Sequence, residues 1–197
     1  MDFSTLLVLD CKTTIWENAK DQPAGQTNEI ICVDVALVDT NKNEIVEHEI
    51  IYVKPKKSRV SLYCERLFGI PQYKLDANGI SFDEAYRKLR VHYMSRDRLW
   101  ASWGKYEKYT LDKQCKSLEL DPLFTSTHLD IQHLYSLMMG APADVITLGE
   151  AIKQCDAKMT DNCAYDAASI YMRMAKGLRP TVKTRIVVPT HLNRSVN

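Results

Sequence analysis

Residues 6–17 read LLVLDCKTTIWE, and this stretch decides how the fold is interpreted. Four aliphatic residues predict a core strand that ends at Asp10, just before the polar pair Thr13 and Thr14. Because alternate residues of a strand face the same side, Asp10 and Lys12 should project together. The stretch therefore predicts a charged pair at the end of a core strand.

The residues that follow predict further strands and then helices. Runs rich in β-branched residues at 29–38 and 44–53 complete a meander with the first strand, and a short fourth strand is expected at 99–102. Ser81 and Glu84 have the spacing of a capping box, and Gly69 suits a helix end. Helical patterns occupy residues 61–67, a segment from Ser81 onward, 105–118, 129–139, 148–155 and 161–175. This order predicts one α/β domain with a mixed sheet.

Composition limits the possible functions. A chain of 197 residues is long enough for one well-buried domain and short for two. A formal net charge of +1 means that any binding to nucleic acid must use a local patch. No run approaches the roughly 18 apolar residues of a membrane span, and the first residues lack the basic segment of a signal peptide. We therefore expect no membrane partner.

The six cysteines are widely spread, without a C-x-x-C pair. This spacing favours reduced thiols over a disulfide framework or a zinc site. We therefore expect a cytoplasmic protein. Cys163 lies close in sequence to the acidic residues considered next.

Four acidic residues are candidates for a shared site: Asp10, Glu107, Asp161 and Asp166. Two-metal hydrolysis of phosphodiesters needs carboxylates from different elements, which hold two divalent ions roughly 3.5–4 Å apart. Glu107 opens the helix after the Trp-Gly turn, and an N-cap at Asp161 would let it face one cleft together with Asp166. Each acid taken alone is better explained as a solvated surface residue, and it is their joint arrangement that points to a site.

The order and spacing of several motifs resemble the DEDDh (DnaQ-like) 3′–5′ exonuclease family, most closely its branch that trims histone mRNA and small RNAs. The similarity extends from Leu6 to about Leu178. It is carried by residues 10–17, where the family has D-x-E-x-T followed by Trp, and by Asn28-Glu29-Ile30-Ile31, Tyr52-Val53-Lys54-Pro55, Cys64-x-x-Leu67-Phe68-Gly69-Ile70, Ser102-Trp103-Gly104-Lys105-Tyr106-Glu107, His128-Leu129-Asp130, Leu148-Gly149-Glu150-Ala151 and Asp166-Ala167-Ala168. The resemblance implies an RNase H-like domain at residues 1–178, with a five-stranded mixed sheet flanked by helices, and a basic tail at 179–197.

The same resemblance implies metal ligands at positions 10, 12, 107 and 166 and a general-base histidine at position 161. Asp10 and Asp166 match this pattern, and Glu107 stands where the family has Asp. Lys12 stands where the family has Glu, and Asp161 stands where it has His. Any metal would therefore be held by Asp10, Glu107 and Asp166.

Lys12 changes the chemistry most. Its ammonium should lie near the place of an ion between Asp10 and Asp166, and such a pairing at about 4 Å is worth on the order of 4 kcal/mol before desolvation at an effective dielectric near 20. Loss of the imidazole removes the obvious proton acceptor for attacking water. We therefore expect a degenerate exonuclease site without a cofactor, in a protein that binds single-stranded RNA or DNA, RNA ends included, with little or no cleavage.

Two alternatives remain open. A weak metal-dependent 3′–5′ exonuclease would use Asp10, Glu107, Asp161 and Asp166 with Mg²⁺ or Mn²⁺. A scaffold for a protein partner would also fit the nearly neutral net charge.

Residues expected to contact nucleic acid lie near the predicted site: Thr13, Trp16, Phe68, Trp103 and Tyr106. Aromatic rings there could stack on bases, at roughly 1–3 kcal/mol per base. Packing in the core is the competing interpretation, above all for Trp103 and Phe68.

Two basic segments are further candidates for phosphate contacts. One is the turn with Lys54, Lys56, Lys57 and Arg59, for which a solvated loop is the simpler explanation. The other is the tail, which carries three arginines, one lysine and no acid after Gly177. We expect the tail to be partly ordered, with Pro180 as a break and an edge strand at residues 184–188.

Overall fold

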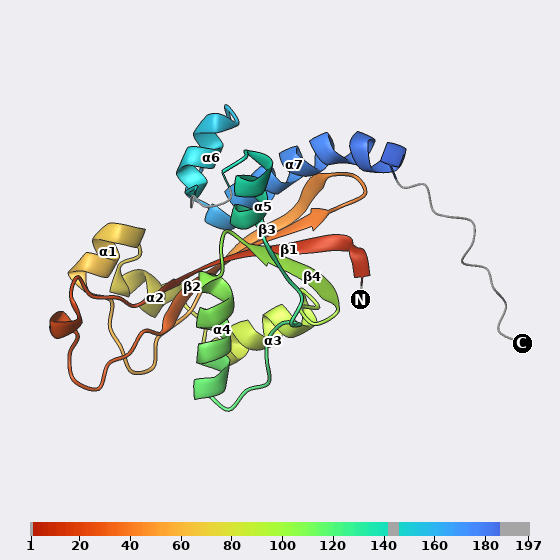
Figure 1. Ribbon diagram of the computed structural model, residues 1–197. Helices are drawn as coiled ribbons and strands as arrows, with labels where there is room; N and C mark the ends of the chain where they lie inside the picture. Colours follow the sequence, from red (N-terminus) through yellow and green to blue (C-terminus); the bar gives the residue numbers. More distant parts are fainter. Residues whose placement is uncertain (1, 142–145, 186–197) are drawn as a thin grey trace, which may run out of the picture.

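The computed structural model describes residues 2–141 and 146–185, and its centre is one five-stranded sheet in the order β3-β2-β1-β4-β5 (Figure 1). The antiparallel meander consists of β1 (Asp2–Thr13), β2 (Ile30–Asp39) and β3 (Glu44–Tyr52). On the other side of β1, β4 (Arg98–Ser102) pairs parallel to it, and β5 (His128–Asp130) pairs parallel to β4. The predicted mixed five-stranded sheet is confirmed.

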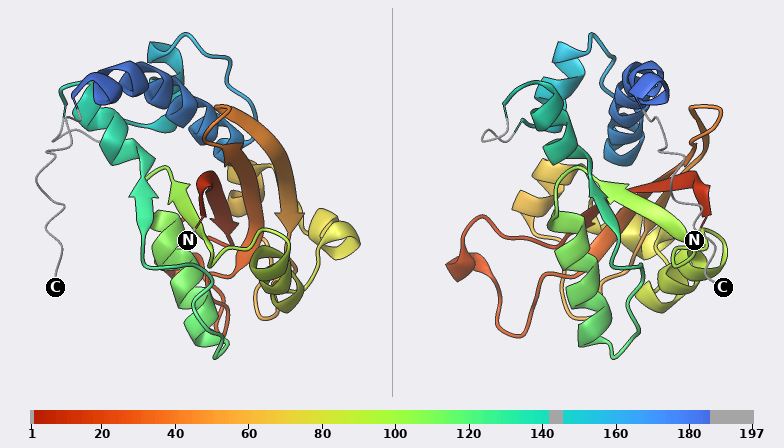
Figure 2. Two further views of the ribbon diagram at one scale, coloured as in Figure 1. Left: turned by 90° about the vertical axis from the view of Figure 1, so that its right-hand side faces the viewer. Right: turned by 45° about the vertical axis from the view of Figure 1, so that its right-hand side comes forward.

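Helices cover both faces of this sheet, as Figure 2 shows. One face packs against α3 (Phe82–Val91) and α4 (Tyr106–Ser117), and the other against α5 (Ile131–Met138), α6 (Leu148–Gln154) and α7 (Cys163–Arg185). The alternation along β1 explains the two cores, because Leu7 and Leu9 enter the first and Leu6 and Val8 the second. The short helices η1 (Ala19–Asp21), α1 (Leu62–Phe68) and α2 (Gln72–Asn78) lie in the connections.

Local signals at several helix ends agree with the prediction. Ser81 and Glu84 form the expected capping box at the start of α3. Gly69 ends α1 with φ of 64°, a conformation that glycine adopts without a steric penalty. The helix expected at 129–139 begins two residues later, because Leu129 and Asp130 belong to β5 and the Asp130 side chain caps α5.

The last helix is longer than expected. It runs from Cys163 to Arg185, and therefore crosses both Pro180 and the expected boundary after residue 178. The edge strand predicted at 184–188 is wrong for Thr184 and Arg185, which are helical, and its other residues lie outside the described part of the chain. The first half of the helix is buried, and extending an existing helix costs less than starting one, which favours continuation past Pro180 although proline donates no hydrogen bond.

All six cysteines are free thiols, in agreement with the sequence. Within residues 2–141 and 146–185, no helix combines the length and apolar character that a membrane crossing requires.

Candidate functional site

The C-terminal end of β1 carries the charged pair that the sequence singled out. Asp10 and Lys12 project from the same side of the strand, and Cys11 and Thr13 from the other. β1 lies between β2 and β4, so this end of the strand is flanked by residues of several other elements. Asp10 is aligned with Asp34 of β2 in the strand register.

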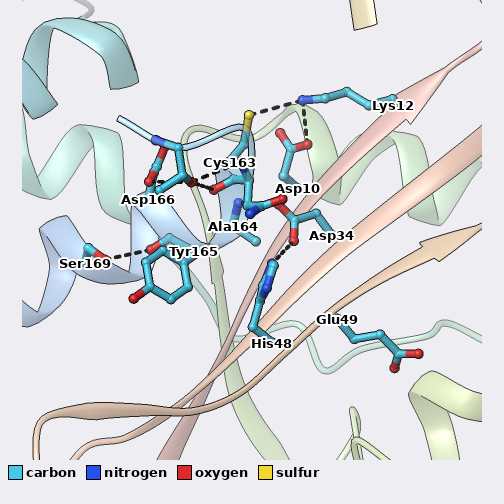
Figure 3. Close-up of polar contacts among 12 residues, drawn as sticks. Asp10, Lys12, Asp34, His48, Glu49, Cys163, Ala164, Tyr165, Asp166 and Ser169 are labelled. Atoms are coloured by element: carbon cyan, nitrogen blue, oxygen red, sulfur yellow. Dashed lines mark hydrogen bonds and ion pairs between the residues drawn. The ribbon is translucent and has the colours of Figure 1, made fainter. Parts of the chain in front are cut away.

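The Lys12 ammonium occupies the space in front of Asp10 (Figure 3). Its Nζ lies 2.6 Å from Asp10 Oδ2 and donates a hydrogen bond to Cys163 Sγ at 3.4 Å. The same nitrogen lies 5.6 Å from the ring centroid of Phe68. Burial alone would lower the pKa of Lys12, but the Asp10 carboxylate outweighs it and holds this pKa above its ordinary value. Lys12 is therefore a permanent cation bound to Asp10.

Cys163 is the uncharged partner in this group. Burial raises the pKa of its thiol, and the Asp10 carboxylate raises it further, against the opposing effect of Lys12. The contact is therefore one between an ammonium and a neutral thiol. The sequence placed Cys163 beside the site but gave no direction for its side chain, which the structure provides.

Asp166 lies in the first turn of α7 and is buried. Thr160 binds both of its carboxylate oxygens, through the backbone N–H at 3.0 Å and through the hydroxyl at 2.9 Å. Asp161 is exposed in the segment before the helix. The Asp166 N–H donates to the carbonyl of Asn162, so helical hydrogen bonding begins one residue after Asp161. The N-cap role predicted for Asp161, which would have turned it towards Asp166, is therefore wrong.

Glu107 lies in the first turn of α4 and is only 5% exposed. The turn before it depends on Gly104, whose φ of 92° disfavours any side chain and whose Cβ position would lie 3.0 Å from Gln132 Oε1. Burial, together with the nearby Asp10 charge, raises the pKa of Glu107 to about 7. In the described part of the chain its buried Oε2 has no hydrogen-bond partner.

A second acid–base pair, which the sequence did not reveal, lies next to Asp10 (Figure 3). Asp34 Oδ1 accepts from His48 Nε2 at 2.8 Å, and Oδ2 accepts from the N–H of Ala164 at 2.9 Å. The His48 ring meets Tyr165 edge to face, with centroids 5.6 Å apart. Burial raises the pKa of Asp34, while these hydrogen bonds oppose the change. In the sequence, this pair could have been suspected from Asp34, an acidic residue inside the otherwise apolar run at 30–38.

The residues predicted to contact nucleic acid fall into two groups. Thr13 is buried, and its hydroxyl lies 3.0 Å from that of Tyr106, whose side chain is 53% exposed. Trp16 and Phe68 are half-buried. Trp103 packs against Tyr135 and donates to the carbonyl of Ile146 at 3.2 Å, so core packing accounts for this residue.

The donors at this site do not fit a two-metal centre. Among the residues that the structure describes, no three His, Cys, Asp or Glu side chains gather in a metal-binding arrangement. Asp10 is paired with an ammonium, both oxygens of Asp166 are bound by Thr160, and Lys12 offers a cation where a ligand would be needed. Glu107 has a free oxygen, but one carboxylate cannot hold two ions.

Comparisons with known proteins agree with the fold. No protein-family model matches the chain. The protein described as "Probable 3'-5' exonuclease KapD" from Bacillus subtilis (strain 168) is 28% identical over 116 residues, which are 58% of this chain and 55% of that protein. The match thus spans about half the length of that relative.

Solved structures extend this similarity over nearly the whole chain. The nuclease domain of 3′hExo, a DEDDh family member bound to rAMP, has a TM-score of 0.74 and 21% identity, covering 91% of this chain and 93% of that one. A 3′-exonuclease that recognises the histone mRNA stem-loop has a TM-score of 0.73 and 20% identity, covering 89% and 64%. Cell-death related nuclease 4 (CRN-4) has the same TM-score and 21% identity, with 89% and 64% covered. The chain has the RNase H-like fold of the DEDDh 3′–5′ exonucleases.

Proposed function

We propose that this chain uses the DEDDh exonuclease fold to bind single-stranded nucleic acid, RNA ends in particular, with little or no cleavage. The observation that carries the proposal is the Lys12 ammonium 2.6 Å from Asp10. Asp10 belongs to the acids that would have to hold a metal ion, and its charge is already compensated from within the chain. In this proposal Lys12, and not a metal ion, compensates the charge of Asp10.

The energetic consequence of this pair is a competition between Lys12 and any divalent ion. Both side chains are mostly buried, with 24% and 19% of their surface exposed, so water screens their attraction less than at an open surface. A cation that bound Asp10 would have to displace the ammonium or accept its repulsion. The single-charge interaction is on the order of 4 kcal/mol at about 4 Å and an effective dielectric near 20, and a divalent ion would be repelled more strongly.

Proton transfer is the second obstacle to cleavage. Position 161, where the resemblance implies a histidine, holds Asp161, and this side chain is exposed and outside the helix that carries Asp166. The histidine that does lie nearby, His48, is bound to Asp34 through Nε2. The expected general base is therefore missing from its place.

Binding remains possible with the residues present. The exposed ring of Tyr106 can stack on a base, and base–aromatic stacking is worth roughly 1–3 kcal/mol. The Lys12 ammonium can also face a phosphate. The similarity to 3′hExo bound to rAMP and to a 3′-exonuclease on the histone mRNA stem-loop supports a nucleic-acid ligand.

One observation favours the alternative of a weak 3′–5′ exonuclease. The buried Oε2 of Glu107 has no hydrogen-bond partner among the described residues, and unsatisfied polar atoms of this kind are often functional. If Lys12 swung away, Asp10, Glu107 and Asp166 would be left as acidic ligands for Mg²⁺ or Mn²⁺. The similarity to a protein described as a probable 3′–5′ exonuclease agrees with this alternative.

The test uses a 5′-labelled single-stranded RNA with purified protein in Mn²⁺, resolved on a denaturing gel, with Asp10→Ala run alongside. Binding is measured in parallel by fluorescence anisotropy. We expect bound but intact RNA. A ladder of products shortened from the 3′ end that disappears in Asp10→Ala would replace our proposal by the weak exonuclease. Absence of binding would favour the protein scaffold.

A further inference from the structure

A pocket of about 500 Å³ lies beside α4, on the same face of the sheet as α3. Its walls come from three places: the end of β1 and the segment before β2, the basic turn after β3, and one side of α4. Thr13, Asn28, Lys57, Tyr106 and Lys113 are among its lining residues. The pocket therefore starts where the Asp10–Lys12 strand ends and continues away along the helix.

The basic turn that forms one wall is held in a fixed conformation. The buried carboxylate of Glu29 accepts three backbone hydrogen bonds, from Lys56 at 2.9 Å, Lys57 at 2.9 Å and Ser58 at 2.7 Å. The Ser58 side chain is linked in turn to Thr27 through two further hydrogen bonds. A loop fixed in this way presents its lysines from a defined backbone, which reduces the entropy lost when a ligand binds.

The charge of the lining is strongly positive. Lys54, Lys56, Lys57 and Lys113 line the pocket with Glu29 as the acid among them. Lys56 is paired with Asp83 at 3.1 Å, whereas in the part of the chain that the structure describes the other three lysines have no carboxylate within ion-pair distance. The formal net charge of the whole chain is only +1, so the pocket concentrates positive charge locally.

An exposed aromatic ring joins the pocket to the Asp10–Lys12 site. Tyr106 lines the pocket, and its hydroxyl is 3.0 Å from that of Thr13, three residues after Asp10 on the same strand. Three strand residues span roughly 10 Å. Thr13 projects from the opposite side of β1 to Asp10 and Lys12, so a chain whose end lies at that pair has to pass round the end of the strand, beside Tyr106, to enter the pocket.

We propose that this pocket binds the sugar–phosphate backbone of a single-stranded nucleic acid on the 5′ side of the end held at Asp10 and Lys12. Lys57 of the basic turn and Lys113 of α4 contact its phosphates, and the Tyr106 ring stacks on a base. This mixture of basic and aromatic side chains suits single strands, whose bases are free to stack. The inference rests on the proposed function, because it assigns the path of the same ligand.

The test is the salt-dependent affinity for a 5′-fluorescein-labelled ten-nucleotide oligouridylate, measured by anisotropy. The variant Lys57→Gln/Lys113→Gln removes one lysine from the basic turn and one from α4. The control Lys108→Gln/Lys116→Gln removes two lysines from the same helix that line a different pocket, next to Phe124. Thermal melting of both variants checks that they are folded.

We expect the pocket variant to bind about 10-fold more weakly than the wild-type protein, with a log–log salt slope smaller by about 1.4, which is roughly 0.7 for each lost single-strand phosphate contact. The control should bind within about twofold of wild type. The same loss is expected with a deoxythymidylate ten-mer, because phosphates are common to both ligands.

If both variants lost affinity equally, the pocket would not be the binding site. The lysines would then act only through the overall positive charge, and the proposed function would still stand. If the pocket variant lost affinity for only one of the two oligonucleotides, the ribose one or the deoxyribose one, the assignment of phosphate contacts would be overturned. If the wild-type protein bound neither oligonucleotide, the proposed function itself would fail, and the pocket proposal with it.

Discussion

Asp10 and Asp34 face each other across β1 and β2, and they show how the same residue type takes different roles in neighbouring positions. Asp10 is paired with the ammonium of Lys12 on its own strand. Asp34 is bound by His48 of β3 and by the backbone N–H of Ala164 at the start of α7. Asp34 therefore connects three elements of the fold, whereas the Asp10 pair belongs to the candidate binding site.

The difference lies in what each carboxylate would leave behind if it were removed. Loss of Asp34 would bury an unsatisfied N–H of the helix and remove the partner of His48. Loss of Asp10 would release an ammonium whose side chain is 24% exposed and which can turn towards water. Asp34 should therefore matter for stability and Asp10 for the site.

Asp34 should contribute more to stability than Asp10. Asp34→Ala should lower the free energy of unfolding by about 3 kcal/mol, because a buried donor that loses its acceptor costs about 1–3 kcal/mol and a hydrogen bond to His48 is lost as well. Asp10→Ala should cost about 1 kcal/mol or less. Urea denaturation of both variants measures the difference, and losses of the same size would contradict the separate roles.

Glu107, which lies near Asp10, should make the free energy of unfolding depend on pH. Its pKa of about 7 in the folded protein lies above its ordinary value of 4.5, so the folded state holds this proton more tightly than the unfolded state. The resulting stability is fully present below pH 4.5 and is lost as the pH rises through about 7. The loss should be on the order of 3 kcal/mol, and Glu107→Gln should remove this pH dependence.

Denaturation of the wild-type protein and Glu107→Gln from pH 4 to pH 9 checks this expectation through the difference between the two curves. Asp10→Ala provides the matched control, because removal of the nearby charge should weaken the pH dependence without abolishing it. Parallel curves for wild type and Glu107→Gln would show that Glu107 is not the group concerned.

The smallest effect is expected at the imidazole. His48→Phe, which keeps a ring but has no donor, should cost about 1 kcal/mol of unfolding free energy, since Asp34 loses one hydrogen bond but keeps the one from Ala164. The variant is measured in the same urea series. If this variant lost as much free energy of unfolding as Asp34→Ala, the hydrogen bond to His48, and not the one from the helix N–H, would account for the contribution of Asp34.

Most of the fold was predictable because its elements have strong local patterns. The meander strands and the capping box at Ser81 were recognisable from β-branched runs and from the Ser–Glu spacing. The short strand β5 and the seven-residue helix α2 were not placed, because β5 has only three residues and the N-cap of α2 makes no side-chain hydrogen bond. Elements of this size depend on tertiary contacts.

The candidate site also combines features that depend on the local sequence with features that depend on tertiary contacts. Asp10, Lys12, Glu107 and Asp166 were candidates because they stand near the ends of recognisable elements, and their roles stay a prediction. The pairing of Asp34 with His48 depends on the position of β3 beside β2, and the contact between Lys12 and Cys163 joins residues 151 positions apart. Asp161 was misplaced because a shift of two residues in the start of a helix moves a side chain from the cap to solvent.

The most direct test of the proposed role of Lys12 is titration calorimetry of Mn²⁺ into the wild-type protein and Lys12→Glu. Arg59→Glu, a charge reversal at an exposed position in the turn after β3, is the control. We expect Lys12→Glu to bind Mn²⁺ at least tenfold more tightly than the wild-type and control proteins, because it replaces the ammonium at Asp10 by a ligand. Equal affinities of the wild-type protein and Lys12→Glu would contradict the conclusion that Lys12 takes the place of a metal ion.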